Sequence, residues 1–183
     1  MKLPASVAAR GGYLLCAGAV VLLDQATKLL AHRFLRGRDA LEIVPGFFNL
    51  WYSRNAGGLF GWFREWSDPW RTLFLTLLPL AAIGFILRFL LRGPEEDRSS
   101  LLGLALILGG AVGNLIDRLL RGEVVDFLDV YAAHPPLAAW LIEWFGTAHW
   151  PTFNLADSAI VIGAGLLLLQ VALGPRAAER AAG

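Results

Sequence analysis

The sequence predicts an all-α membrane protein with four transmembrane helices and a small β-rich cradle outside the bilayer. Of the 183 residues, 56% are hydrophobic and only 17% are charged, which is too apolar for an ordinary soluble domain of this length. The apolar residues are also concentrated in four stretches, each about as long as a membrane-spanning helix. We therefore expect one membrane domain, with spans at residues 12–31, 70–91, 101–120 and 158–173 and loops at 32–69 and 121–157.

The first apolar stretch is interpreted as a span and not as a cleaved signal peptide. Lys2 and Arg10 precede it, as basic residues precede a signal peptide, but no small-x-small cleavage site follows its apolar core. The polar sequence Asp24-Gln25-Ala26-Thr27-Lys28 lies at its end instead.

The loop at residues 32–69 provides the first predicted β structure. Its segment 41–52 is rich in aromatic and β-branched residues, which favour strands, and Asn55-Ala56-Gly57-Gly58 is typical of a tight turn. We expect short strands that rest on the bilayer surface. In the span that follows, Pro79 is tolerable because neighbouring helices can satisfy the carbonyl group that it frees.

The third span combines small and polar residues near its C-terminal end. Gly109 and Gly113 permit close contact with another helix. Asn114 and Asp117 follow on roughly one side of the helix. A hydrogen-bond clamp between helices would explain this pattern, with Arg118 extending its charged group to the membrane interface.

The loop at residues 121–157 contains both a β-like run and a helical stripe. Val124-Val125-Asp126-Phe127 places a carboxylate among apolar neighbours. A stripe at helical spacing that would suit the membrane interface follows Pro135-Pro136: Leu137, Trp140, Leu141, Trp144 and Phe145. Where the fourth span begins, Asn154 or Asp157 could simply cap the helix.

The polar residues of the spans gather at one membrane face. Four crossings put the ends of spans one and three and the start of span four on the same side, where the sequence has Asp24, Lys28, Asn114, Asp117, Asn154 and Asp157. All seven tryptophans lie in or beside the two loops on that side, as expected of a residue that prefers the headgroup layer. Lysine and arginine counts are similar on the two sides, and only the higher charge density of the shorter segments favours cytoplasmic termini.

Ionisable residues in a span call for a role, since an Asp or Arg at its centre costs about 2.5–3.5 kcal/mol on insertion scales. A local ion pair between Asp24 and Lys28 is one structural explanation. Asp126 and Asp157 add two carboxylates on one face. Two carboxylates within about 5 Å of each other share a proton. The anionic one can then accept a proton from an attacking water while the other donates to a peptide carbonyl.

Other functions fit the sequence less well. A net charge of +1 and scattered basic residues argue against a nucleic-acid partner. The single Cys16 allows no intramolecular disulfide, and the three histidines lack the spacing of a metallopeptidase site. Two alternatives stay open: a Ser158 or Ser53 nucleophile paired with Lys28, and a small proton-coupled transporter or structural membrane protein.

Five sequence blocks resemble the bacterial lipoprotein signal peptidases, also called signal peptidase II. They occur in the family's order from the first span to the fourth, and the ordered set is highly specific although each block alone is weak. The blocks are Asp24-Gln25-Ala26-Thr27-Lys28, Asn55-Ala56-Gly57, Gly113-Asn114-Leu115-Ile116-Asp117-Arg118, Val124-Val125-Asp126-Phe127 and Phe153-Asn154-Leu155-Ala156-Asp157-Ser158.

The resemblance implies a membrane aspartyl endopeptidase with Asp126 and Asp157 as its catalytic dyad. Its substrate would be a prolipoprotein, cleaved before a diacylglyceryl-modified cysteine without any metal or organic cofactor. Family members are targets of the antibiotic globomycin. The resemblance gives supporting or substrate-binding roles to Asp24, Lys28, Asn55, Gly57, Asn114, Asp117, Arg118 and Asn154.

The same resemblance implies a multi-pass protein of the bacterial inner membrane. Its termini would be cytoplasmic, its β-rich cradle and active site would lie at the periplasmic face, and membrane lipids would surround its spans. We expect it to be a monomer. Two features depart from the family pattern: Gly58-Leu59-Phe60 follows Asn-Ala-Gly, and a Trp-rich segment at 131–150 lengthens the connection between the two aspartates. We expect this segment to affect substrate access.

Overall fold

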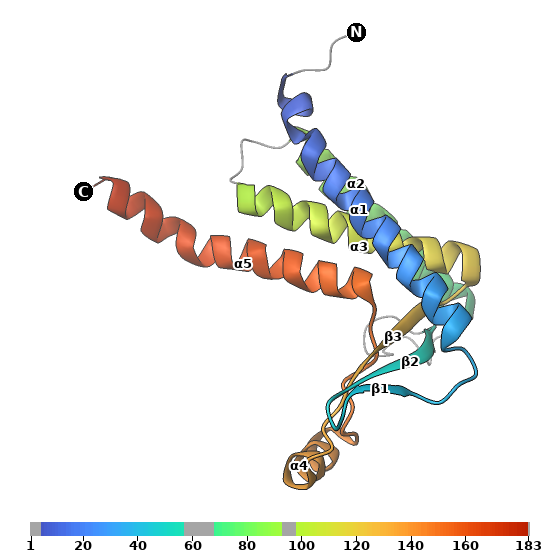
Figure 1. The fold of residues 1–183 in the computed structure, drawn as a ribbon. Helices are drawn as coiled ribbons and strands as arrows, with labels where there is room; N and C mark the ends of the chain where they lie inside the picture. The colour runs from blue at the N-terminus through green and yellow to red at the C-terminus, as the bar shows by residue number, and fades with distance from the viewer. Residues whose placement is uncertain (1–4, 57–67, 93–97, 183) are drawn as a thin grey trace. The chain divides into compact units, whose positions relative to one another are not determined.

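The computed structural model describes residues 5–56, 68–92 and 98–182 (Figure 1). It contains a three-stranded antiparallel sheet. Within the described ranges, four helical segments are long and apolar enough to cross a membrane: Arg10–Phe34, Leu73–Arg92, Arg98–Arg121 and Leu155–Leu173. The predicted fold class, four membrane helices with a small β-rich part, is confirmed.

The long helices extend beyond the apolar stretches that predicted them. Asp24 and Lys28 lie inside the first helix, and both side chains are fully buried. The helix continues through them because its backbone hydrogen bonds do not depend on side-chain polarity and because other parts of the fold bind the side chains. The long helices are α1 (Ala5–Phe34), α2 (Asp68–Arg92), α3 (Arg98–Arg121) and α5 (Leu155–Ala182).

The sheet has the strand order β1-β2-β3, with β1 at Leu41–Val44, β2 at Phe48–Asn55 and β3 at Val124–Val130. Gly46, with a φ of 76°, permits the turn between β1 and β2. A short helix, α4 (Pro135–Phe145), follows β3, and Gly146 ends it in the left-handed conformation. The segments expected as strands and as a short helix therefore adopt those structures.

The chain divides into two compact units, which are described separately. Unit 1 comprises residues 1–24, 76–116 and 155–183, and unit 2 comprises residues 25–75 and 117–154. Unit 1 contains most of the membrane helices. Unit 2 contains the sheet and α4. The predicted organisation as one domain stays a prediction.

The core of unit 1 is formed where α1 and α2 pack against α3. Ala17 from α1, Leu90 from α2 and Ala105 and Leu108 from α3 are buried together. Arg10 is also buried, and its guanidinium donates to the carbonyl oxygen of Leu90, 2.9 Å away. A basic side chain thus satisfies a carbonyl near the C-terminal end of α2, where the helix itself provides no partner.

Small residues bring α3 and α5 into close contact. A Cβ atom added to Gly163 in α5 would lie 2.5 Å from the carbonyl oxygen of Gly103 in α3, and one added to Gly103 would lie 2.8 Å from the carbonyl oxygen of Gly163. Backbone meets backbone at this crossing, as is common where helices pack in a membrane. Any larger side chain must push the two helices apart.

We therefore expect Gly163→Ala to destabilise the protein, by about 1–3 kcal/mol if the overpacking resembles that in other well-packed cores. Gly165→Ala is the matched control, because a Cβ at Gly165 meets nothing within 4 Å. Thermal unfolding of the purified protein in detergent measures both variants. A midpoint for Gly163→Ala equal to that of Gly165→Ala would contradict the close α3–α5 crossing.

Candidate active site

In unit 2, the Asp126 carboxylate on β3 is buried and bound by two asparagine side chains. Asn154 Nδ2 donates to Oδ1 at 2.7 Å, and Asn55 Nδ2 donates to Oδ2 at 3.1 Å. The strand register explains the second contact: Ser53 pairs with Asp126 and Asn55 pairs with Val124, so Asn55 and Asp126 share a face of the sheet. The two amides hold the carboxylate in one orientation.

The backbone that precedes α5 carries Asn154 to this carboxylate. Phe153 forms an antiparallel bridge with Leu128, in which each N–H donates to the other residue's carbonyl oxygen. The Phe127 N–H donates to the same Phe153 oxygen at 3.0 Å. The side chain of the next residue, Asn154, is therefore delivered to Asp126, and its Nδ2 also lies 3.3 Å from the Val125 carbonyl oxygen.

A second buried carboxylate, Asp117 at the end of α3, organises the start of β3. Its Oδ2 is 2.9 Å from Lys28 Nζ and accepts the backbone N–H of Val125 at 3.1 Å. Its Oδ1 is paired with Arg121 and accepts from Gln25 Nε2 at 3.2 Å. Lys28 and Asp117 are both fully buried, so each charge stabilises the other where water cannot. Val125 directly precedes Asp126, so Asp117 fixes the backbone that carries the Asp126 carboxylate.

In unit 1, polar groups of α1, α3 and α5 meet. Asp24 Oδ1 accepts the backbone N–H of Ala156 at 3.0 Å, so a carboxylate from α1 satisfies a free donor at the start of α5. Asn114 Nδ2 donates to Asp157 Oδ1 at 2.7 Å. A Cβ on Gly113 would lie 2.6 Å from Asp24 Oδ2, and glycine at this position therefore leaves room for the carboxylate.

The predicted site residues are divided between unit 1 and unit 2. Arg118 is partly buried at the end of α3, and Gly57 lies outside the described residues. The pairing of Asp126 with Asp157 stays a prediction, because the first belongs to unit 2 and the second to unit 1. The remaining predicted residues are Lys28, Asn55, Asp117 and Asn154 in unit 2, and Asp24 and Asn114 in unit 1.

Some polar contacts were not predicted from the sequence. Arg121 lies four residues after Asp117, a spacing that could have indicated the ion pair. A further cluster joins Asn49 and His149 to the buried Asp129, at 3.1 Å and 2.9 Å. The strand register places Asn49 opposite Asp129. Within residues 5–56, 68–92 and 98–182, no group of three His, Cys, Asp or Glu side chains is placed to hold a metal ion.

Comparison with known proteins gives consistent similarities. The family described as Signal peptidase (SPase) II matches residues 16–173. The chain is 41% identical to the lipoprotein signal peptidase of Syntrophus aciditrophicus over 159 residues, which cover 87% of this chain and 91% of that one. It is 42% identical to that of Geobacter metallireducens over 153 residues, 82% of this chain and 84% of that one.

Solved structures agree with these sequence similarities. A bacterial membrane enzyme determined by the in meso method at 2.3 Å resolution superposes with a TM-score of 0.71 and 29% identity. The match covers 88% of this chain and 87% of that one. A second such structure, at 1.9 Å resolution, gives a TM-score of 0.70 with the same identity and covers 88% of this chain and 92% of that one. The likeness therefore extends over both units.

The Asp117 cluster leads to a stability prediction. Asp117→Asn removes the anion that neutralises the buried Lys28, and breaking a buried ion pair from one side costs about 3–5 kcal/mol. We expect a large drop in the thermal unfolding midpoint in detergent. The double variant Lys28→Gln/Asp117→Asn should recover part of the loss, since it removes the buried positive charge together with the negative one.

Glu123→Gln serves as the control. It removes the ion pair between Arg54 and Glu123, whose side chains are 49% and 33% exposed, and pairs of this kind contribute about 0–1 kcal/mol. If Asp117→Asn unfolded at the same temperature as Glu123→Gln, the buried cluster would not have the stabilising role assigned to it.

Proposed function

Because the chain belongs to the signal peptidase II family, we propose that it cleaves prolipoproteins before a diacylglyceryl-modified cysteine, with Asp126 and Asp157 as its catalytic dyad. The family is one of aspartic peptidases, and the protein is a membrane lipoprotein signal peptidase. The alternative of a transporter or structural membrane protein is not favoured. The dyad, the scissile bond and the orientation in the membrane are the parts that we propose.

Chain connectivity supports the dyad. Asn154 donates to Asp126 at 2.7 Å and lies three residues before Asp157. Three residues of chain span at most about 10–11 Å, so the Asn154 Cα cannot be farther than that from the Asp157 Cα. Both carboxylates also accept hydrogen bonds from asparagine side chains: Asp126 from Asn154 and Asn55, and Asp157 from Asn114. Such contacts hold a reacting group in one orientation.

The proposed reaction divides acid and base roles between the two aspartates. One is anionic and accepts a proton from the water that attacks the carbonyl carbon of the scissile bond. The other is protonated and donates to the carbonyl oxygen as the tetrahedral intermediate forms. Two close carboxylates maintain this unequal state because their like charges oppose full ionisation of the pair.

The remaining predicted residues would support this chemistry. We propose that Lys28 and Asp117 hold the start of β3, and that Asp24 and Asn114 hold the start of α5. Asn55, Gly57, Arg118 and Asn154 would shape the site or bind the substrate backbone. The lipid chains of the substrate would remain in the bilayer, with the termini of the enzyme in the cytoplasm and its site at the periplasmic face. The monomeric state stays a prediction.

A cleavage assay tests the dyad. Asp126→Asn and Asp157→Asn should each reduce cleavage of a diacylglyceryl peptide to background, because the asparagine amide neither accepts the proton of the water nor donates an acidic one. Asp39→Asn is the matched control: it makes the same chemical change at an exposed aspartate, and its activity should equal that of the unmodified enzyme. Globomycin should inhibit the active proteins.

The same assay distinguishes the alternatives. Ser158→Ala should retain substantial activity, since the amine of Lys28 is already engaged in an ion pair with Asp117 and is not held for a serine nucleophile. Unimpaired cleavage by either dyad variant would rule out the aspartyl mechanism, and complete loss in Ser158→Ala would favour a Ser/Lys mechanism. Proton-coupled transport in vesicles, without cleavage, would favour a transporter.

A further inference from the structure

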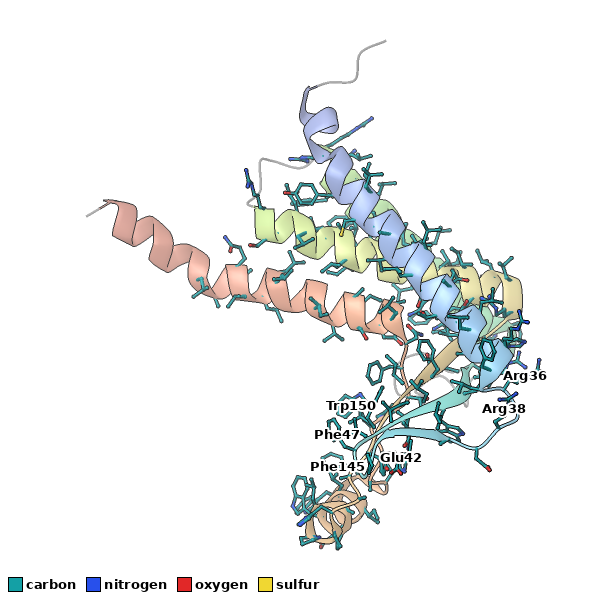
Figure 2. All side chains as sticks on the ribbon, viewed as in Figure 1. Arg36, Arg38, Glu42, Phe47, Phe145 and Trp150 are labelled. Carbon is teal, nitrogen blue, oxygen red and sulfur yellow. The ribbon has the colours of Figure 1, made fainter. Side chains whose placement is uncertain are left out.

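The segment at residues 148–153 runs antiparallel to β3 in unit 2 and pairs with it by backbone hydrogen bonds. The Trp150 N–H donates to the Val130 carbonyl oxygen at 2.8 Å, and Tyr131 and His149 form an antiparallel bridge. Figure 2 labels Trp150 of this segment beside the sheet. Because β2 pairs with β3 as well, β3 has a backbone partner on each side.

The register between this segment and β3 shifts along its length. His149 lies opposite Tyr131. Four residues later in the segment, Phe153 lies opposite Leu128, which is only three residues before Tyr131 in β3. The segment thus contains an extra residue in this stretch, where Pro151 has no N–H to donate. Since a slip of one residue turns side chains to the other face of a sheet, the segment needs a contact that specifies its register.

The side chains of Asp129 and His149 provide such a contact. The His149 Nδ1 atom lies 2.9 Å from Oδ1 and 3.2 Å from Oδ2 of Asp129, and Asn49 Nδ2 donates to Oδ2 at 3.1 Å. The Asp129 carboxylate is buried, whereas His149 is 49% exposed. A displaced segment would withdraw the imidazole donor from a carboxylate that water does not reach, and leaving such a group without its donor is costly.

The His149 ring is also held by Tyr131. The two rings are stacked, with centroids 5.2 Å apart and planes inclined by 14°. The Tyr131 hydroxyl donates to Glu42 Oε1 at 2.6 Å, and this hydrogen bond lowers the pKa of Glu42 and raises the pKa of Tyr131. The Gly46 N–H lies 3.0 Å from both the hydroxyl and the carboxylate. Tyr131 is therefore anchored to the β1–β2 turn and gives the imidazole a fixed surface.

The other end of the segment leads to the candidate active site. Asn154 directly follows the segment, is fully buried, and donates to Asp126 Oδ1 at 2.7 Å. Asp126 and Asp129 are three residues apart in β3, so their side chains lie on opposite faces of the sheet. His149 and Asn154 thus bind two carboxylates of one strand, from the two sides of the register shift.

We propose that Asp129 and His149 form a clasp that fixes the register of the segment and thereby positions Asn154 against Asp126. The two residues are then positioning residues of the active site, although neither touches the reacting atoms. The proposal rests on the proposed function, in which Asp126 is a member of the dyad. Without the clasp, the regular register competes with the shifted one, and the backbone before Asn154 is displaced by one residue, roughly 3.3 Å.

The clasp also closes the long connection that departs from the family pattern. Residues 133–147 include α4, and they leave β3 and return beside it, because the Ala132 N–H donates to the Ala148 carbonyl oxygen at 3.0 Å. The Asp129–His149 contact lies next to this hydrogen bond. A contact at the base of a loop offsets the entropy that closing the loop costs. The conformation of residues 133–147 therefore does not determine where Asn154 lies.

Steady-state cleavage of a diacylglyceryl peptide by the full chain in detergent tests the clasp. His149→Phe keeps a ring on Tyr131 but has no donor for Asp129, and it should lower kcat by about tenfold with KM little changed, because a small displacement of a site group is costly. His149→Asn should restore most of kcat, since the asparagine Nδ2 is as many bonds from the backbone as the imidazole Nδ1. His134→Phe is the matched control, at an exposed histidine without a side-chain capping bond, and should match the unmodified enzyme.

Amide hydrogen exchange followed by mass spectrometry gives a readout that does not depend on cleavage. In His149→Phe, peptides that cover residues 148–154 should exchange several-fold faster than in the unmodified protein, while peptides from α3 exchange at the same rate and show that the variant is folded. His149→Asn and His134→Phe should leave the exchange of residues 148–154 unchanged. Equal exchange of this segment in His149→Phe and the unmodified protein would overturn the clasp.

Asn154→Ala separates a failure of the clasp from a failure of the proposed function. If Asn154→Ala and His149→Phe both lose kcat, the positioning role is supported. If Asn154→Ala loses kcat and His149→Phe cleaves normally despite faster exchange, the proposed function stands and the positioning role of the clasp is overturned. Normal cleavage by Asn154→Ala would contradict the role that the proposed function gives to this residue, and the positioning proposal would fail with it.

Discussion

The buried Asp117 carboxylate is the contact on which unit 2 depends most. It neutralises Lys28 from α1, pairs with Arg121 one turn later in α3, and accepts the N–H of Val125 at the start of β3. One side chain thus joins α1, α3 and β3. Because Lys28 is fully buried, loss of this anion removes a charge partner from a group that water does not reach. The position of Asp126 follows from this constraint.

A similar principle operates in unit 1, where Asp24 binds the backbone at the start of α5. Polar groups in a membrane helix are costly, and here the Asp24 carboxylate binds a backbone N–H that has no partner within its own helix. Glycines on α3 make the short distances possible, as at Gly113 beside the Asp24 carboxylate. Small residues and buried carboxylates therefore act together to place Asn114 against Asp157.

The sequence predicted much of the architecture because the relevant signals are local. Apolar length indicated the four spans, and β-branched and aromatic residues indicated strands near Leu41 and Val124. Partners were harder to assign. A local pair with Asp24 was one explanation of Lys28 from the sequence, and it stays a prediction. The ion pair of Lys28 with Asp117, which is far away in sequence, was not expected. Likewise, the contact of Asn49 with Asp129 depends on the register between two distant strands, and no short-range pattern reveals it.

The pairing of Asp126 with Asp157 is the central claim, and cross-linking of the two positions tests it most directly. Asp126→Cys/Asp157→Cys in a Cys16→Ala background should be joined in membranes by a short reagent that carries two thiol-reactive groups, because such a reagent joins thiols whose side chains approach one another. Asn114→Cys/Asp157→Cys, whose native side chains meet at 2.7 Å, provides the positive control. A cross-link in both proteins is the expected result, whereas a cross-link in the control alone would contradict the dyad.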